Sequence, residues 1–272
     1  MLRCGSQTID LSRPVVMGVL NVTPDSFSDG GRYREVDTAV SHGLRLAEEG
    51  ASIIDVGGES TRPGADPVDA QEEIRRVVPV IEKLRAQTAA IISVDTSKPQ
   101  VMLSAAAVGA GLINDVRALS EEGALEAAIA TQCAVCLMHM QGDPRSMQVA
   151  PHYDDVVTEV KAFLAERVNV CRAAGMPAER IVIDPGFGFG KTLEHNLELL
   201  RHLRELGTEL PIMVGLSRKS IVGRLTGRPS GERVHGSVAL AVIAVMNGAR
   251  IVRAHDVGAT VDALKIVSAV QM

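Results

Sequence analysis

The sequence has few aromatic residues, which make up 2% of its 272 positions, and it has no tryptophan. A core usually draws in the large hydrophobic side chains first, so this one must be built mainly from aliphatic residues. Of the six phenylalanines and tyrosines, four lie in glycine-rich segments instead: Phe27, Tyr33, Phe187 and Phe189. We interpret their positions as a hint of stacking surfaces for a flat ligand.

Cysteine is also scarce, with four residues: Cys4, Cys133, Cys136 and Cys171. Cys133 and Cys136 form a C-x-x-C pair, which allows a redox or zinc interpretation. No second pair accompanies it, and it lies in the apolar run QCAVCLMH. Residues i and i+3 of a strand point to opposite faces, so we interpret both cysteines as small buried hydrophobes.

No apolar run approaches the roughly 18 residues of a membrane span. The first residues, MLRCGSQTIDLSRP, are too polar for a signal peptide, so we expect a cytoplasmic protein. The net charge of −5 offers no general attraction to nucleic acid or to an anionic membrane, and neither is expected as a partner. An anionic small-molecule substrate would therefore need a local basic cluster.

Three common motifs are absent as well. Neither H-x-H nor H-E-x-x-H occurs, which argues against a zinc hydrolase. The segment GVLNVTPDS lacks G-x-G-x-x-G, so a dinucleotide site is not indicated. DPGFGFGKT, residues 184–192, resembles a phosphate-binding loop, but Pro185 stands where that loop requires glycine. We expect Lys191 and Thr192 to lead into the next helix.

Short apolar runs alternate with longer segments of helical periodicity, several of which end at a glycine such as Gly50, Gly175 or Gly248. Buried strands that alternate with helices predict a parallel sheet, and eight units in one chain predict a single (β/α)8 barrel domain over residues 1–272. An open, doubly wound sheet is the alternative. The runs cover residues 15–20, 52–56, 90–94, 111–115, 134–138, 180–184, 211–215 and 250–254.

Polar residues directly adjoin several of these runs, most notably Asp95, Asn114 and Asp184. The active site of such a barrel lies at the carboxyl ends of the strands, where a buried Asp or Asn is costly unless a partner pairs with it. Three such groups and one lysine suit a flat heterocycle with many N–H and C=O edges. Each could instead cap a helix or brace a loop, which is our preferred interpretation for Asp115 and Asp256.

The last run ends in RAHD, so Arg253 and His255 alternate and point to the same side of an extended chain. They form the local basic cluster that a phosphate would require in an acidic protein. Two long loops, NVTPDSFSDGGRY after the first run and GGESTRPGADP after the second, have a composition that suits closure over a substrate.

The motifs MGVLNVTPDSFSDGG, DVGGESTRPGA, SVDTSKP, INDVRAL, LMHMQGDPRSMQ, DPGFGFGKT, GLSRKS and RAHDV resemble those of the dihydropteroate synthase family, in order, from residue 17 to residue 257. The resemblance implies a (β/α)8 barrel that acts in folate biosynthesis. Its members join 6-hydroxymethyl-7,8-dihydropterin diphosphate to p-aminobenzoate, releasing diphosphate, with magnesium. It also implies a homodimer and competition by sulfonamides, which mimic p-aminobenzoate.

The resemblance implies residue roles. It assigns the pterin floor to Asp95, Asn114, Asp184 and Lys219, and the wall of that pocket to Met138, Gly188 and Phe189. It places Asn21 with the metal, Arg253 and His255 with the diphosphate, and Ser220 with the carboxylate of p-aminobenzoate. Phe27 and Asp29 belong to the first loop, and Thr61, Arg62 and Pro63 to the second. Ser217 and Ala254 join the substrate-binding positions, and the catalytic roles fall to Arg253, His255, Asp29 and Lys219.

An arylamine is already a neutral nucleophile at pH 7, so no dedicated base is needed. The leaving diphosphate is attached to a carbon that an electron-rich pterin carries, so the C–O bond can break before the new bond forms. We therefore expect an ionisation-first substitution in which charge grows on the leaving diphosphate. Two alternatives remain: a methyl-folate-binding methyltransferase domain, which shares the pterin chemistry but does not need the Arg253–His255 cluster, and a non-catalytic pterin-binding subunit.

Overall fold

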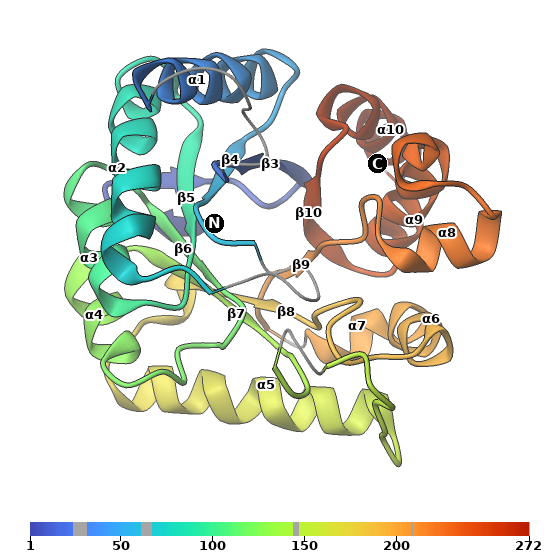
Figure 1. Cartoon of the computed structure of the whole chain (residues 1–272). Coiled ribbons are helices and arrows are strands. Elements are labelled where there is room, and N and C mark those ends of the chain that lie inside the picture. Colours follow the sequence, from blue (N-terminus) through green and yellow to red (C-terminus); the bar gives the residue numbers. More distant parts are fainter. Residues whose placement is uncertain (24–31, 61–66, 144–146, 208, 272) are drawn as a thin grey trace.

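The computed structural model describes residues 1–23, 32–60, 67–143, 147–207 and 209–271. Eight parallel strands close into a barrel in the order β10-β3-β4-β5-β6-β7-β8-β9, with helices around it (Figure 1). This confirms the (β/α)8 barrel and excludes the open sheet. The barrel strands are β3 (Val15–Asn21), β4 (Ile53–Gly57), β5 (Ile91–Asp95), β6 (Leu112–Asp115), β7 (Ala134–Met138), β8 (Ile181–Asp184), β9 (Ile212–Val214) and β10 (Ala249–Ala254).

The helices connect successive strands, as the sequence periodicity predicts. Gly50, Gly175 and Gly248, which were expected to end helices, have φ angles of +101°, +90° and +108°, a left-handed conformation that glycine adopts without strain. Within the described residues, no helix combines the length and the apolar character that a bilayer crossing requires. The helices are α1 (Arg32–Glu48), α2 (Ala70–Arg85), α3 (Pro99–Ala107), α4 (Ala124–Thr131), α5 (Val156–Ala173), α6 (Leu193–Arg201), α7 (Leu203–Leu206), α8 (Ser220–Thr226), α9 (Val234–Met246) and α10 (Val257–Gln271).

Two hydrophobic clusters fill the fold, one between the barrel and its helices and one inside the barrel. The inner cluster receives at least one side chain from every barrel strand: Met17, Ile53, Ile91, Leu112, Ala134, Cys136, Val182, Met213 and Ile251. The alternation of side chains along a strand explains the separation, because residues that face the barrel axis recur with a period of two.

A short amino-terminal hairpin of β1 (Leu2–Cys4) and β2 (Gln7–Ile9) adds to the inner cluster. Its Leu2 and Cys4 are each 1% exposed and belong to that cluster, at the end of the barrel where the strands begin. This hairpin was not predicted from the sequence, since three-residue strands are too short to show a period-two pattern.

Candidate active site

The same alternation places polar side chains inside the mouth of the barrel. Two residues beyond the inner-cluster positions Ile53, Ile91, Leu112, Val182 and Ile251, the next inward positions are Asp55, Ser93, Asn114, Asp184 and Arg253. The packed apolar layer thus forms the floor beneath a ring of hydrogen-bonding groups.

Asp55 is the centre of this ring and is fully buried. Its Oδ1 accepts a hydrogen bond from Ser93 Oγ at 2.6 Å, and its Oδ2 accepts one from Asn114 Nδ2 at 2.9 Å. Because a carboxylate can only accept, the amide nitrogen of Asn114 must face Asp55, which leaves Asn114 Oδ1 to face elsewhere. Asp55 therefore sets the orientation of Asn114, a predicted pterin-binding residue.

Arg253 bridges two carboxylates. Its Nε donates to Asp55 Oδ2 at 2.7 Å and its Nη2 to Asp95 Oδ2 at 2.8 Å. Burial on its own would lower the pKa of Arg253, but the two carboxylates raise it. Burial raises the pKa of Asp95 to about 7, and Asp55 adds to the rise while the Arg253 guanidinium opposes it. Arg253 is thus a counter-ion within the site.

Asp184 and Lys219 form the opposite side of the mouth. Burial raises the pKa of Asp184, although Lys219 and the hydrogen bond from Gly186 N–H to Asp184 Oδ1, 2.7 Å long, act in the other direction. Burial lowers the pKa of Lys219 to about 8 against the opposing effect of Asp184. Lys219 Nζ donates to Phe187 O at 2.5 Å and lies 4.6 Å from the ring centroid of Phe189.

The phenylalanines of the segment 184–192 therefore differ in role. Phe187 is fully buried in the outer hydrophobic cluster, so the hint that it offers a stacking surface is wrong. Phe189 is half-buried beside Lys219 and can still form a wall of the pocket.

Thr192 caps α6 with its side chain, which confirms that it leads into the next helix. Lys191 does more than lead there, because its side chain is buried beneath the loop.

The loop between β9 and α8 is braced from β10. Arg218 has a left-handed φ of +59°, which is uncommon for a residue with a side chain. Its guanidinium forms two bonds to Asp256, of 3.0 and 2.5 Å, which confirms Asp256 as a brace. His255 N donates to Ser217 Oγ at 3.1 Å, so two predicted site residues from different strands meet. Ser220 opens α8 and is exposed.

The remaining predicted residues lie around the same mouth. Met138 ends β7 and is buried, Gly188 has a φ of +79°, and Ala254 is buried at the end of β10. Five predictions, on residues of the two long loops, fall outside the described residues: Phe27, Asp29, Thr61, Arg62 and Pro63.

Asn21 ends β3, and its Oδ1 is the oxygen that the sequence prediction assigns to magnesium. A Cβ placed on Gly57 would lie 3.8 Å from Asn21 Oδ1 and 3.7 Å from Asp95 Oδ2, so both oxygens lie beside Gly57, and Asp95 Oδ2 already accepts a bond from Arg253. Across the described ranges, no group of three or more His, Cys, Asp or Glu side chains could hold a metal. A hard cation that keeps several waters and binds one or two protein oxygens fits this donor set.

Two other expectations concern structural residues. Asp115 is fully buried and accepts bonds from Ser97 Oγ and from the backbone N–H groups of Arg117 and Leu119, so it braces a loop as expected. The four cysteines are free and buried. Cys133 belongs to the outer cluster and Cys136 to the inner one, which confirms that they face opposite sides of the strand.

Some residues around the mouth were not predicted from the sequence. Asp55 was visible at a strand end, but nothing in the sequence showed that it joins Asn114 and Arg253. Lys98 was also missed: its Nζ lies 2.5 Å from Oε2 of both Glu59 and Glu73, and Glu59 Oε1 accepts from Val68 N at 3.0 Å. Glu59 thereby links the two ends of the second long loop.

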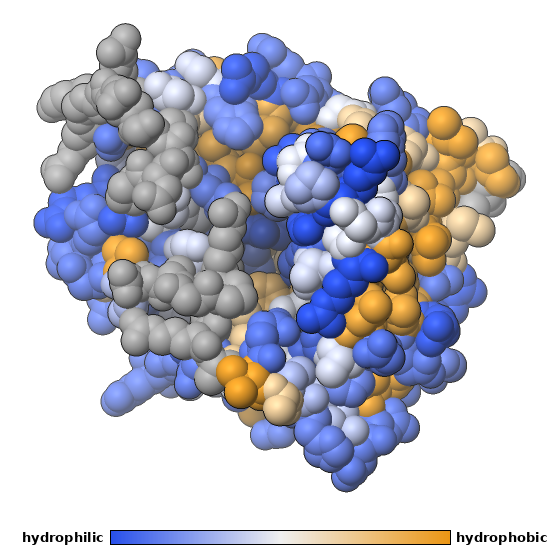
Figure 2. All heavy atoms as spheres, turned by 45° about the vertical axis from the view of Figure 1, so that its right-hand side comes forward, coloured by the Kyte–Doolittle hydropathy of each residue, from blue (hydrophilic) through white to orange (hydrophobic). Residues whose placement is uncertain are grey.

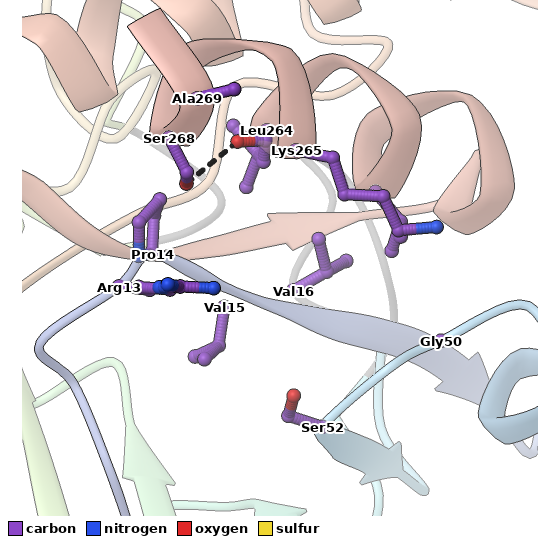
Figure 3. Close-up of a pocket in the computed structure, with 11 residues that line it drawn as sticks. Arg13, Pro14, Val15, Val16, Gly50, Ser52, Leu264, Lys265, Ser268 and Ala269 are labelled. Carbon is purple, nitrogen blue, oxygen red and sulfur yellow. Dashed lines mark hydrogen bonds between the residues drawn. The ribbon is translucent and has the colours of Figure 1, made fainter. Parts of the chain in front are cut away.

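A cavity of about 310 Å³ lies at the other end of the barrel, between the start of β3 and α10 (Figure 3). Arg13 and Lys265 line it together with Ser52, Ser268 and apolar side chains. None of the predicted site residues that the structure describes lines it, so the barrel mouth is the candidate active site.

Comparisons with known proteins identify the family of this chain. A family model described as pterin binding enzyme matches residues 17–255. The chain is 54% identical to the dihydropteroate synthase of Escherichia coli K12 over 263 residues, 96% of this chain and 93% of that protein. A Yersinia pestis dihydropteroate synthase in a sulfonamide complex superposes with a TM-score of 0.94 at 55% identity, covering 99% of this chain and 98% of the other. The Xanthomonas albilineans enzyme with 7,8-dihydropteroate gives 0.90 at 53% identity, covering 98% and 97%.

Proposed function

Because this chain belongs to the pterin-binding enzyme family and has the dihydropteroate synthase activity of its relatives, we propose how its residues divide the work of that reaction. The enzyme condenses 6-hydroxymethyl-7,8-dihydropterin diphosphate with p-aminobenzoate to 7,8-dihydropteroate and diphosphate, in folate biosynthesis. The observation that carries the assignment of roles is the ring of buried acceptors at the barrel mouth, within the matched residues 17–255.

The pterin heterocycle binds to the buried acceptor side chains at the barrel mouth. Asp184 and Asn114 offer oxygens to the N–H groups of the heterocycle, and Asp95 extends the acceptor surface. Lys219 supplies the complementary donor for a ring carbonyl or nitrogen. Asp184, Asn114 and Asp95 are buried, Lys219 is half-buried, and all four are bonded to their neighbours before the substrate arrives, so they contribute orientation rather than proton transfer.

Arg253 and His255 stabilise the leaving diphosphate. Arg253 has five N–H donors, of which its bonds to Asp55 and Asp95 use two, so it can hold the carboxylates and still meet an anion. Negative charge grows on the diphosphate as the C–O bond breaks. A fixed cation at that point stabilises this charge and lowers the activation free energy of the reaction.

Asn21 Oδ1 would help to hold a magnesium ion at the same place, and the ion would neutralise charge on the diphosphate when bound. The arylamine of p-aminobenzoate attacks as a neutral nucleophile, with its carboxylate toward Ser220. The residues Phe27 and Asp29 of the first loop, and Thr61, Arg62 and Pro63 of the second, stay predicted contributors to a lid that excludes water. A sulfonamide is bound by the Yersinia pestis relative, and we propose that one would compete here too.

We further propose a homodimer that uses α9. This helix contains no Asp, Glu, Lys or Arg. Its outer face exposes Ile243 by 43% and Met246 by 54%, and Leu225 of α8 is 52% exposed. Figure 2 turns the α8–α10 side forward and shows hydrophobic side chains gathered on it. A helix that is apolar on all sides is normally covered, and a second copy of this chain is the partner that the family resemblance implies.

The cytoplasmic location stays a prediction from the sequence.

The proposed reaction is tested by measuring diphosphate release and dihydropteroate formation together, with each substrate omitted in turn. We expect one diphosphate for each dihydropteroate, no product when either substrate is missing, and loss of activity on chelation that added magnesium restores. Diphosphate release without any dihydropteroate would contradict the proposal.

A further inference from the structure

The glycine-rich loop 186–190 has an unusual set of hydrogen bonds. Every one of its five successive carbonyl oxygens accepts a bond from a side chain. The donors are Lys191 Nζ to Gly186 O at 3.0 Å, Lys219 Nζ to Phe187 O at 2.5 Å, Gln148 Nε2 to Gly188 O at 2.5 Å, Lys191 Nζ to Phe189 O at 2.9 Å and Tyr153 Oη to Gly190 O at 2.9 Å. An irregular segment held at every carbonyl is a rigid part of the site rather than a loose connection.

Lys191 supplies two of these bonds from beneath the loop. Its side chain is 3% exposed, and its Nζ also lies 2.9 Å from His139 Nδ1. An ammonium can only donate, so His139 Nδ1 is the acceptor and His139 is neutral with its proton on Nε2. Burial lowers the pKa of His139 to about 3, and the Lys191 charge adds to this. Lys191 Nζ also lies 3.4 Å from His139 O, so its three donors have four acceptors within reach, which allows a charge to be buried.

Gly186 connects Lys191 to the pterin floor. Its carbonyl accepts from Lys191 Nζ, and its N–H donates to Asp184 Oδ1 at 2.7 Å. A Cβ on Gly186 would come within 1.9 Å of His139 O, so the backbone of the loop packs directly against the segment after β7. Movement of Gly186 would therefore move the Asp184 carboxylate.

The Lys191 charge also acts on Asp184 directly. It lowers the pKa of the Asp184 carboxyl, in the same direction as Lys219 does. Reciprocally, Asp184 opposes the effect of burial, which lowers the pKa of Lys191 to about 7.

We propose that Lys191 is a positioning residue for pterin recognition, which holds the loop 186–190 from below and, through Gly186, fixes the ionised Asp184 carboxylate toward the ligand. The inference rests on the proposed role of Asp184 as a pterin-binding residue. Lys191 itself contacts no substrate.

The test compares Lys191→Met with Tyr153→Phe, because both remove a buried donor to the same loop and only the first removes a charge. The probe is free 6-hydroxymethyl-7,8-dihydropterin, titrated by calorimetry from pH 5 to pH 8. We expect Lys191→Met to weaken binding more than about tenfold, since a hydrogen bond to a charged group is worth more than a neutral one. We expect Tyr153→Phe to weaken it only a few-fold.

The pH dependence separates positioning from a purely structural role. Loss of the Lys191 charge raises the pKa of Asp184, so the pH below which pterin affinity falls should move upward in Lys191→Met and stay in place in Tyr153→Phe. If Lys191→Met does not fold, Lys191→Gln keeps donors to the carbonyls without the charge, and the same upward move is expected.

Two results would overturn the inference. In the first, the pH below which pterin affinity falls is the same in Lys191→Met as in the wild-type protein, and the affinity loss is no greater than that of Tyr153→Phe. Lys191 would then be a structural residue, while the proposed function stands. Absence of pterin binding by the wild-type protein would overturn the proposed function, and this inference with it.

Discussion

Asp55 shows how one buried carboxylate can organise several site residues. It accepts from Ser93, Asn114 and Arg253, which come from strands β5, β6 and β10. Its negative charge offsets the Arg253 guanidinium in a place where an unpaired charge would be costly. A neutral replacement would leave Arg253 with one counter-ion and allow the Asn114 amide to turn.

We expect Asp55→Asn to lower kcat/KM by about 10- to 100-fold, because a hydrogen bond to a charged group is worth about 1.5–3 kcal/mol. Asp115→Asn is the matched control: Asp115 is equally buried and accepts three bonds, but it braces a loop. That variant should lower the free energy of unfolding and leave kcat/KM nearly unchanged. Steady-state kinetics and urea unfolding on both variants check this, and equal kinetic losses would refute the distinction.

On the scale of the elements, the loop after β8 uses its glycine differently from the glycine that follows a helix. Gly186 and Gly175 both have left-handed backbones, with φ angles of +67° and +90°. A Cβ on Gly175 would meet nothing within 4 Å, whereas one on Gly186 would meet His139 O at 1.9 Å. At position 175 glycine is required only by the left-handed backbone. At position 186 it is required both by the left-handed backbone and by the close approach to His139 O.

This contrast predicts different outcomes for two identical substitutions. Gly175→Ala should cost about 1 kcal/mol of unfolding free energy through backbone strain, with pterin affinity retained. Gly186→Ala should cost more, because backbone atoms must move apart, and it should also weaken pterin binding through the displaced Asp184. Urea unfolding and calorimetry measure the two effects, and a Gly186→Ala variant that binds pterin normally would contradict the explanation.

On the scale of the whole molecule, α9 is a helix without charged residues whose outer face is nevertheless exposed. The barrel covers only one side of α9, and the exposed side carries Ile243 and Met246. The barrel sheet is closed and offers no strand edge of its own for association, which favours a helical face as the surface through which two copies would join.

We expect Ile243→Glu to convert the protein from dimer to monomer, since it places a charge in an apolar interface. Leu103→Glu is the control, because Leu103 is similarly exposed, 47% against 43%, but lies on α3 across the barrel (Figure 1). Light scattering after size exclusion reports the mass of each variant. A wild-type monomer, or dissociation by Leu103→Glu alone, would refute the proposed interface.

Much of the architecture followed from patterns that are local in the sequence. Each apolar run became a barrel strand, although the run at 211–215 is shortened to β9, and the glycines after helices have the expected conformation. The hairpin before β3 did not follow, since its strands are too short to show a period. The polar ends of strands were also visible, because an Asp or Asn beside an apolar run stands out.

By itself, the sequence determined the eightfold alternation, the polar strand ends and the family motifs, all of which depend on residues close together in the chain. Only the tertiary structure decided which side chains meet. Asp55 and Arg253 are 198 positions apart, and Lys191 and His139 are 52 apart. Such pairs form because closure of the barrel brings the ends of distant strands to one mouth, where burial forces every charge and donor to find a partner.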